Sequence, residues 1–513
     1  MRRILKPGEN CRAFLRVGEA GLLIDGEEYY RAFYLAARNA KRQILISGWQ
    51  FDSEVALLRG ADARRHGGRY PFLSFLDGLC RERKGLRVYI LAWDFSLIFM
   101  LERQWMQEWV FNWSTNERLF FRFDSRHPIG ASQHQKFVVI DRSIAFLGGM
   151  DICSGRWDDR YHNVESKERV NPDGRGYEPY HDTQSYVTGP LVNDLAAIFA
   201  ARWRDSTGTE IEPDGPDDGF LLPAGSKGIE IPASRAALSL TQAQTLPSPQ
   251  KEVREIRRLH IDAIKAAERL VFIENQYLSS YAVFLALMER MEEAPRPKLE
   301  VVIILPDRPH GIMEEVSIGV TQSRLLNSLK SFAREYGHSM GVYYPAARGP
   351  DEGEVPVYIH SKVLIVDDRF MTIGSANATN RSMGLDSELN ISFEATSLRN
   401  RRLARSIRRV RASLLAEHLG LENAVETGRL GSPEGLVDYL NGLADNGSHR
   451  LKRHSMGAYF DDLSVLKLLN DRLLDPERTI IEENLFEMLS PDTGSVFTEG
   501  VSFFRNWFFR KTG

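Results

Sequence analysis

The sequence His134-Gln-Lys136-Phe-Val-Val-Ile-Asp141 decides the fold, because a second copy, His360-Ser-Lys362-Val-Leu-Ile-Val-Asp367, occurs far along the chain. Side chains alternate between the two faces of a strand, so His and Lys project to one side while the apolar run enters a core. We therefore expect an imidazole and an ammonium group to share one small patch, twice. The closing Asp141 and Asp367 stand at an odd offset and should point elsewhere, as structural partners.

The segments around the two motifs also repeat. Residues 27–42 have apolar positions at helical spacing and precede a short apolar strand over 44–49, and residues 251–277 follow the same plan. The apolar runs Leu86–Asp94 and Leu299–Asp307 both look like buried strands that end in an acidic residue. Since strands alternate with helices, each half is predicted to be an α/β unit of domain size.

This repeat divides the chain into four parts. We expect a first half over residues 1–204 with motif 134–141, a connecting segment over 205–250 and a second half over 251–420 with motif 360–367. Residues 205–250 are rich in Gly, Pro, Asp and Ser, which is typical of a long surface connection. Residues 421–513 are predicted to be a mainly helical extension. Five aromatic residues and several cations over 501–513 fit a helix docked on the body, or an interfacial membrane anchor.

The composition is that of an ordinary globular protein, with 43% apolar and 26% charged residues over 513 positions. The net charge of -3 gives no reason to expect nucleic acid as a partner. The three cysteines suggest neither disulfides nor a zinc knuckle. The N-terminus lacks a signal peptide, and charges interrupt the apolar stretch 94–113, so we expect a cytoplasmic protein that meets membranes only peripherally.

Two histidines and two lysines suit the chemistry of a phosphodiester. Two ammonium groups can neutralise its negative charge and the charge that builds up in a pentacoordinate transition state. One neutral imidazole can attack phosphorus to give a phosphohistidine, while the other protonates the departing alcohol and later accepts a proton from water. This scheme requires no metal and no other cofactor, and the sequence shows no carboxylate cluster for a metal.

Further polar residues follow the motifs. Each imidazole needs a carboxylate on its other nitrogen, and the candidates are Asp182 and Glu388, although either could be a surface acid. Ser375 and Asn377, in the segment Gly374-Ser-Ala-Asn, could donate hydrogen bonds to a phosphate or could be turn residues. The first copy has Gly149 and Asp151 at these two positions, so its phosphate contacts must differ.

At these residues the chain resembles the phospholipase D superfamily, over roughly residues 25–420. Four further stretches resemble the branch that includes eukaryotic phospholipase D: Gly148–Asp159, Tyr180–Thr183, Ile273–Tyr277 and Asp386–Glu388. The resemblance implies a bilobal fold of two pseudo-symmetric α/β/α halves whose motifs meet at the interface. The substrate it implies is a glycerophospholipid, with phosphatidylcholine expected, cleaved to phosphatidic acid and a free head group, with transfer to other alcohols as a further reaction.

The resemblance also implies a role for each motif residue. His134 would be the nucleophile and His360 the general acid and then base. Phosphate binding would fall to Lys136, Lys362 and Asn377. Asp182 and Glu388 would orient the imidazoles.

Other functions remain open. A phosphatidyltransferase, such as a cardiolipin or phosphatidylserine synthase, would use the same site with a lipid alcohol as acceptor, and a nuclease is a more distant alternative. A lipid-binding protein with an inactive site is disfavoured by the intact His and Lys in both motifs. Residues 399–411 hold seven arginines, which could contact anionic lipid or form a solvated helix face. We expect a phospholipid membrane surface as partner and no obligate protein partner.

Overall fold

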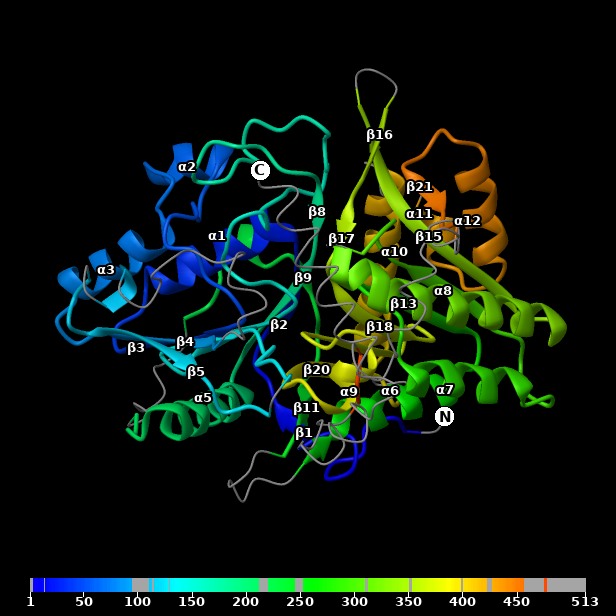
Figure 1. The fold of residues 1–513 in the computed structure, drawn as a ribbon, viewed down its shortest axis with the longest axis horizontal. Coiled ribbons are helices and arrows are strands. Elements are labelled where there is room, and N and C mark those ends of the chain that lie inside the picture. Colours follow the sequence, from blue (N-terminus) through cyan, green and yellow to red (C-terminus); the bar gives the residue numbers. More distant parts are fainter. Residues whose placement is uncertain are drawn as a thin grey trace, which may run out of the picture.

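The computed structural model describes residues 3–12, 14–94, 110–112, 115–128, 130–211, 220–244, 252–309, 312–349, 353–397, 400–421, 427–455 and 475–477. The aromatic segment 501–513 and most of the stretch 94–113 lie outside these ranges. The described residues form two large sheets with helices on their faces, and this α/β architecture confirms the predicted fold class. In Figure 1 the blue and cyan first half lies on the left, and the green to orange second half lies on the right.

The first sheet has eight strands in the order β10-β2-β9-β7-β6-β3-β4-β5. Strand β6 holds the apolar run of the first motif and pairs antiparallel with both β3 and β7. The strands β3, β4 and β5 are parallel. The bounds are β2 (Ala20–Ile24), β3 (Gln43–Gly48), β4 (Arg87–Trp93), β5 (Leu119–Asp124), β6 (Phe137–Ile140), β7 (Ile144–Gly148), β9 (Thr183–Thr188) and β10 (Ile229–Glu230).

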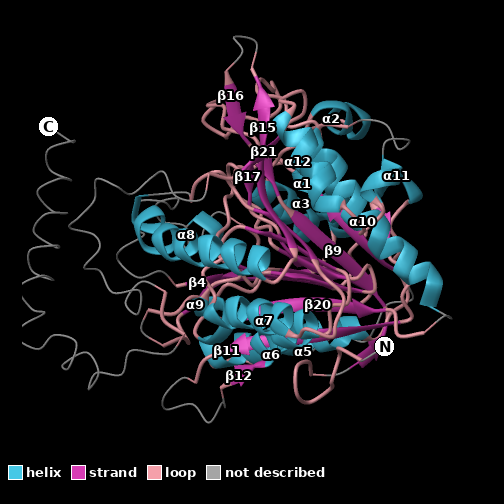
Figure 2. Ribbon diagram, turned by 90° about the vertical axis from the view of Figure 1, so that its right-hand side faces the viewer, coloured by secondary structure: helices cyan, strands magenta, loops and turns pink. Residues whose placement is uncertain are grey.

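The second sheet has eleven strands, with β1-β11-β20-β19-β18-β13-β14-β15-β16 as its main order. Strand β12 pairs with β11, and β21 pairs with β15. The bounds are β1 (Phe14–Arg16), β11 (Arg235–Gln242), β12 (Val253–Arg254), β13 (Leu270–Asn275), β14 (Glu300–Ile304), β15 (Ser339–Arg348), β16 (Glu354–Pro356), β18 (Lys362–Val366), β19 (Phe370–Gly374), β20 (Glu388–Glu394) and β21 (Leu451–Arg453). Strands β15 and β16 form a ribbon that projects from the body (Figures 1 and 2).

The two sheets repeat one topology. The order β2-β9-β7-β6-β3-β4-β5 in the first corresponds strand by strand to β11-β20-β19-β18-β13-β14-β15 in the second. The motif strands β6 and β18 therefore occupy equivalent central positions. A separate small sheet joins the halves, because β8 (Tyr180–His181) pairs in parallel with β17 (Tyr358–Ile359).

Helices cover the outer faces of both sheets. Helices α1 (Asp25–Ala37) and α3 (Phe72–Glu82) pack on the first sheet, while α6 (Glu255–Lys265), α7 (Tyr281–Glu292) and α8 (Ile312–Glu335) pack on the second. The acidic side chains of Glu27 and Glu28 lie in the first turn of α1, where they interact favourably with the positive end of the helix dipole. The remaining helices are α2 (Gly60–His66), α5 (Leu191–Thr207), α9 (Asn380–Gly384), α10 (Arg401–Leu419), α11 (Thr427–Leu430) and α12 (Leu436–Asp445), with a 3-10 turn η2 (Ala224–Ser226). No helix of the described residues combines the length and apolar character needed to cross a membrane.

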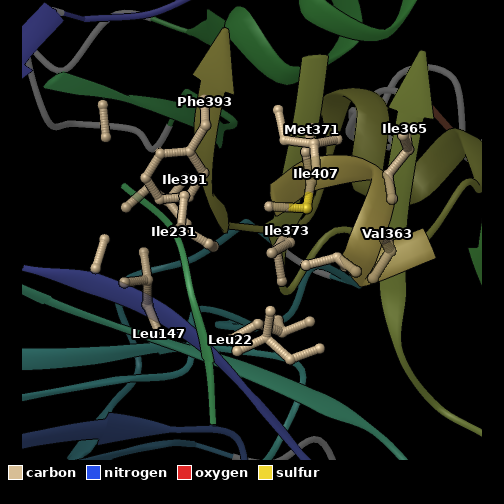
Figure 3. Close-up of a cluster of buried hydrophobic side chains, with 14 of the residues drawn as sticks. Leu22, Leu147, Ile231, Val363, Ile365, Met371, Ile373, Ile391, Phe393 and Ile407 are labelled. Atoms are coloured by element: carbon tan, nitrogen blue, oxygen red, sulfur yellow. The ribbon is translucent and has the colours of Figure 1, made fainter. Parts of the chain in front are cut away.

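The inner faces of the two sheets share one hydrophobic core. Leu22 and Leu147 of the first sheet belong to the same buried cluster as Ile373 and Ile391 of the second, together with side chains of α5 and α10. Figure 3 shows Leu22 and Leu147 facing Ile373 and Ile391 across the junction. Burial of apolar surface on this scale stabilises the docked arrangement of the halves, so the ends of β6 and β18 are held in fixed relative positions.

The expected surface connection over 205–250 is wrong for part of its length. Strand β11 (Arg235–Gln242) is buried within the second sheet, where it pairs with β20, and β10 pairs with β2. The second half therefore begins before residue 251. Beyond residue 421, the described residues form α11, α12 and a short strand, β21, that extends the second sheet.

Candidate active site

The first motif histidine is held by residues of the second half. His134 lies just before β6, and its Nδ1 is 3.1 Å from both carboxylate oxygens of Glu388, the first residue of β20. The backbone N–H of His134 donates to the carbonyl of Ser387 at 3.0 Å. Since an ionised carboxylate only accepts, Glu388 fixes the tautomer with hydrogen on Nδ1 and leaves Nε2 as the basic nitrogen.

The second motif histidine is held by the first half in the same way. Nδ1 of His360 lies 2.6 Å from Oδ2 of Asp182, and the backbone N–H of His360 donates to the carbonyl of His181 at 2.8 Å. The small β8–β17 sheet supplies this register, because His181 ends β8 and Ile359 ends β17. The structure thus brings all four residues to the junction and pairs each imidazole with a carboxylate from the opposite half.

The two lysines have different neighbours. Nζ of Lys136 lies 3.5 Å from Oδ2 of Asp151, and both side chains are buried. Nζ of Lys362 donates to Oε1 of Gln276 at 3.1 Å and lies 3.1 Å from Nδ1 of His360. Two buried ammonium groups next to two imidazoles form a site suited to an anion, because such charges need compensation.

Two hydroxyl groups support Glu388. Ser382 donates to its Oε1 at 2.7 Å, and Ser375 donates to its Oε2. The Ser375 hydroxyl also accepts the backbone N–H of Leu389 at 3.1 Å, so it is committed to the carboxylate rather than to a phosphate.

At the position of the first half that is equivalent to Ser375, a Cβ on Gly149 would lie 2.3 Å from Oδ1 of Asp182. Glycine is therefore required there, which explains why the two motif segments differ.

The electrostatics of the site are asymmetric. Burial first, and then the charge of Lys362, hold the pKa of the His360 imidazole well below 6.5, and Arg156 and Lys136 add to this effect. Burial also lowers the pKa of Lys362 to about 7 and raises the pKa of Asp182 to about 6. His360 is therefore neutral in the free site at neutral pH, and Lys362 titrates close to pH 7.

The remaining motif residues lie around this cluster. Asn377 follows β19, and its buried side-chain Oδ1 makes no hydrogen bond to any described residue. Its contact with a phosphate stays a prediction. Asp141 accepts three backbone N–H groups before β3, at 2.6 to 2.9 Å, and Asp367 accepts three before β13, at 2.7 to 2.9 Å. These two aspartates fix equivalent loops and do not contact the imidazoles.

Several neighbours of the site were not predicted individually. Tyr180 and Tyr358 lie beside His360, with ring centroids 5.5 and 6.4 Å from the imidazole. The guanidinium of Arg156 lies over the Tyr180 ring at 5.0 Å. Tyr180, Arg156 and Gln276 fall inside the stretches that carry the family resemblance, which was a usable signal, whereas Tyr358 and Ser382 had none.

The arginine-rich segment 399–411 is only partly a solvated face. Arg399 lies outside the described residues, and the rest belongs to α10 and the residue before it. Arg411 is fully buried and donates to Asp368 at 2.6 Å, and Arg408 donates to the same carboxylate at 3.3 Å. Other arginines of the helix, including Arg405 and Arg409, line a groove of about 1520 Å³.

The chain is similar to several known proteins. A family model described as "Cardiolipin synthase, PLD-like domain" matches residues 260–409. The chain is 24% identical to phospholipase D alpha 1 of Zea mays, over 78% of this chain and 65% of the maize protein. It is 26% identical to phospholipase D A of Dictyostelium discoideum, over 78% of this chain and 35% of that protein. The chain therefore spans less than two thirds of the length of either relative.

A solved structure shares the fold. The crystal structure of phosphatidylserine synthase from Haemophilus influenzae Rd KW20 aligns with a TM-score of 0.50 and 13% sequence identity. The alignment covers 85% of this chain and 95% of that chain. At this identity the likeness concerns the fold alone.

Proposed function

Because this chain belongs to the phospholipase D superfamily, we propose that it is a phosphodiesterase that hydrolyses glycerophospholipids, with phosphatidylcholine as the expected substrate. The products would be phosphatidic acid and the free head group. We further propose that the protein associates peripherally with a membrane surface and binds its substrate there. Transfer of the phosphatidyl group to a small alcohol would be a second reaction of the same site.

The crossed pairing of imidazoles and carboxylates carries this proposal. His134 with Glu388 and His360 with Asp182 present two oriented imidazoles at one junction, next to Lys136 and Lys362. A reaction with one nucleophile and one acid–base group needs this arrangement, because each ring must offer one defined nitrogen.

The proposed reaction has two displacements at phosphorus. Nε2 of His134 attacks phosphorus and forms an N–P bond while the P–O bond to the head-group alcohol breaks, and His360 donates a proton to the departing oxygen. His360 then removes a proton from water, whose oxygen attacks phosphorus and breaks the N–P bond. Lys136 and Lys362 offset the charge of the non-bridging oxygens in both transition states.

Protonation of His360 must be coupled to substrate binding. In the free site the neighbouring cations keep its pKa well below 6.5, so the imidazole lacks the proton that the first displacement requires. A phosphodiester anion placed among Lys136, Lys362 and Arg156 partly neutralises these cations, which raises the pKa of His360. The acid is thus formed when the substrate arrives.

A phosphatidyltransferase is the second candidate function. The family model that matches residues 260–409 is described by the name of a cardiolipin synthase, and such an enzyme would use the same covalent intermediate. The difference lies only in the acceptor, since a lipid alcohol would replace water in the second displacement.

One assay separates these functions. The purified protein is incubated with vesicles of phosphatidylcholine and phosphatidylglycerol, with and without ethanol, and the lipid products are identified by mass. Phosphatidic acid without ethanol and phosphatidylethanol with it would support the hydrolase. Cardiolipin as the main product would support the transferase. A parallel incubation with plasmid DNA completes the assay, and cleavage of the DNA without any change in the lipids would refute both.

A further inference from the structure

A second polar cluster lies buried between the halves. It adjoins Asp182, the residue that orients His360, but contains none of the motif residues. It consists of Asp25 at the start of α1, His162, His181 on β8 and Glu417 on α10. One ligand atom from each residue lies within 4.8 Å of the others, and all four side chains are no more than 1% exposed. Residues so distant in sequence gave no sign of a cluster before the fold was known.

The atoms of the cluster are close together, and His162 is hydrogen-bonded to Glu417, but His181 and Asp25 are poorly aligned for hydrogen bonds. Nδ1 of His181 lies 2.7 Å from Oε1 of Glu417 and 3.0 Å from Oδ1 of Asp25. Nε2 of His162 lies 3.2 Å from Glu417 and 3.5 Å from Oδ2 of Asp25. Even so, His181 Nδ1 and Asp25 Oδ2 make no hydrogen bond with any described residue. Leaving such buried atoms unsatisfied is costly.

A shared metal ion accounts for the convergence of these four side chains and for the poor alignment of His181 and Asp25, and it requires the contacts of 2.7 and 3.0 Å to lengthen when the ion binds. Zinc lies about 2.0–2.2 Å from nitrogen and oxygen ligands, so tetrahedral neighbours stand roughly 3.3–3.5 Å apart. The lone pair of the imidazole nitrogen then points at the ion, and the carboxylate oxygens lie to either side of that direction instead of along it. Two imidazoles and two carboxylates form a ligand set of the type that zinc accepts.

The outer contacts of the two histidines are also those of metal ligands. Nδ1 of His162 lies 3.0 Å from Oδ2 of Asp158, a carboxylate that Arg169 also contacts. Nε2 of His181 lies 3.0 Å from Oε1 of Glu274. A metal-bound histidine usually donates its second N–H to such a carboxylate, which fixes the tautomer with the free lone pair toward the ion.

We propose that Asp25, His162, His181 and Glu417 bind one divalent transition-metal ion of the zinc class. The ion is structural, because the protein supplies four ligands, and it is independent of the reaction proposed above. It compensates the charge of two carboxylates, Asp25 and Glu417, that are buried side by side. Two protonated histidines could compensate the same charge, but a proton on His181 Nδ1 would have no aligned acceptor.

The ion would position the loop that orients His360. The backbone N–H of Asp25 donates to the carbonyl of Asp182 at 2.9 Å, and the N–H of Asp182 donates to Oδ1 of Asp25 at 3.2 Å. Ligands from α1, β8 and α10 also join the two halves. The arginine-lined groove reaches Glu417, whose Oε2 accepts from Nε of Arg160 at 2.6 Å.

The unaltered protein provides the first test. It is purified without chelators, incubated with Zn²⁺ and desalted, and its metal content is measured by mass spectrometry. We expect about one zinc ion per chain, removal by a strong chelator with a lower Tm, and recovery of the Tm with Zn²⁺ but not Mg²⁺. Fewer than roughly 0.2 ions per chain, with a Tm that the chelator does not change, would overturn the proposal.

Variants locate the ion. Glu417→Gln and Asp25→Asn should reduce bound zinc at least about fivefold, whereas His260→Gln, which alters a buried histidine bonded to the Ile256 carbonyl, should retain it. Zinc retained in both ligand variants would place the ion elsewhere and overturn the proposal. If these variants do not fold, Co²⁺ added to the chelated unaltered protein gives the answer. We expect the visible absorption bands of tetrahedral Co²⁺, and we expect one equivalent of Zn²⁺ to abolish them. The lack of such bands would contradict the site.

Discussion

Nδ1 of His134 lies 3.1 Å from both carboxylate oxygens of Glu388, a residue 254 positions away in the other half of the molecule. His360 and Asp182 form the reciprocal pair at 2.6 Å. Neither half therefore contains both members of either motif imidazole–carboxylate pair. The shared hydrophobic core that docks the halves is as necessary for the site as the motif residues themselves.

Removing the charge of Glu388 should reduce turnover without unfolding the protein. Glu388→Gln keeps the shape of the side chain but can present its N–H₂ to Nδ1, which allows the wrong tautomer, so we expect kcat to fall on the order of 10²- to 10⁴-fold. Glu394→Gln is the matched control, because Glu394 is a buried acid of the same strand that accepts the backbone N–H groups of Ile4 and Leu5. Steady-state kinetics on short-chain phosphatidylcholine measure both, and an equal fall in both would contradict an orienting role.

Replacing either motif histidine by itself should abolish nearly all turnover. His134→Ala removes the proposed nucleophile and His360→Ala removes the proposed acid and base, and since both act in one reaction, each should lower kcat at least about 10³-fold. His260→Gln should leave kcat nearly unchanged, because its imidazole is buried on α6 and contacts a backbone carbonyl. Substantial turnover by either alanine variant, measured as released head group, would be incompatible with paired imidazoles.

Anion binding should weaken as the pH rises through 7. Burial lowers the pKa of Lys362 to about 7, so the ammonium is present at pH 6 and mostly lost at pH 8. Sulfate keeps its charge over this range, and we expect its Kd to rise up to about tenfold between these pH values. Isothermal titration calorimetry measures the change. Lys362→Met should bind sulfate more weakly and with less dependence on pH, and an equally steep dependence in that variant would assign the effect to another group.

Asp141 should contribute to stability rather than to chemistry. Its carboxylate accepts three backbone N–H groups, and its φ of 48° is unfavourable for most residues but tolerated by Asp and Asn. Asp141→Ala should therefore lower the free energy of unfolding by about 2–4 kcal/mol. Asp141→Asn should lose less, because it keeps one acceptor and the same backbone preference. Urea denaturation compares them, and an alanine variant as stable as the unaltered protein would refute this role.

The repeat made much of the fold predictable. Two motif strands with equivalent flanking helices and strands implied two similar α/β halves, and the order of the strands in both sheets agrees with that repeat. Strand β11 was missed because the surrounding residues 205–250 are rich in Gly, Pro and Asp, which masked a short apolar run. Composition averaged over such a long segment cannot reveal one buried strand within it.

The site was predictable only in its parts. The four motif residues were identified from their local spacing, although His134, Lys136 and His360 lie just before the motif strands and only Lys362 lies in one. The crossed pairing of Glu388 and Asp182 depends on how the halves dock, and no local pattern records it. The commitment of Ser375 to Glu388, and the approach of Asp182 to Gly149, are likewise tertiary contacts. The buried cluster around His181 joins four distant segments for the same reason.

The covalent intermediate is the most direct test of the two-histidine site. The protein is mixed with phosphatidylcholine, quenched in alkali within the first turnovers and digested, and the peptides are analysed by mass spectrometry. We predict a phosphatidyl group on the peptide that contains His134, lost on longer incubation with water or ethanol and never formed by His134→Ala. Product formation without any adduct, or with the adduct on another residue, would contradict the account.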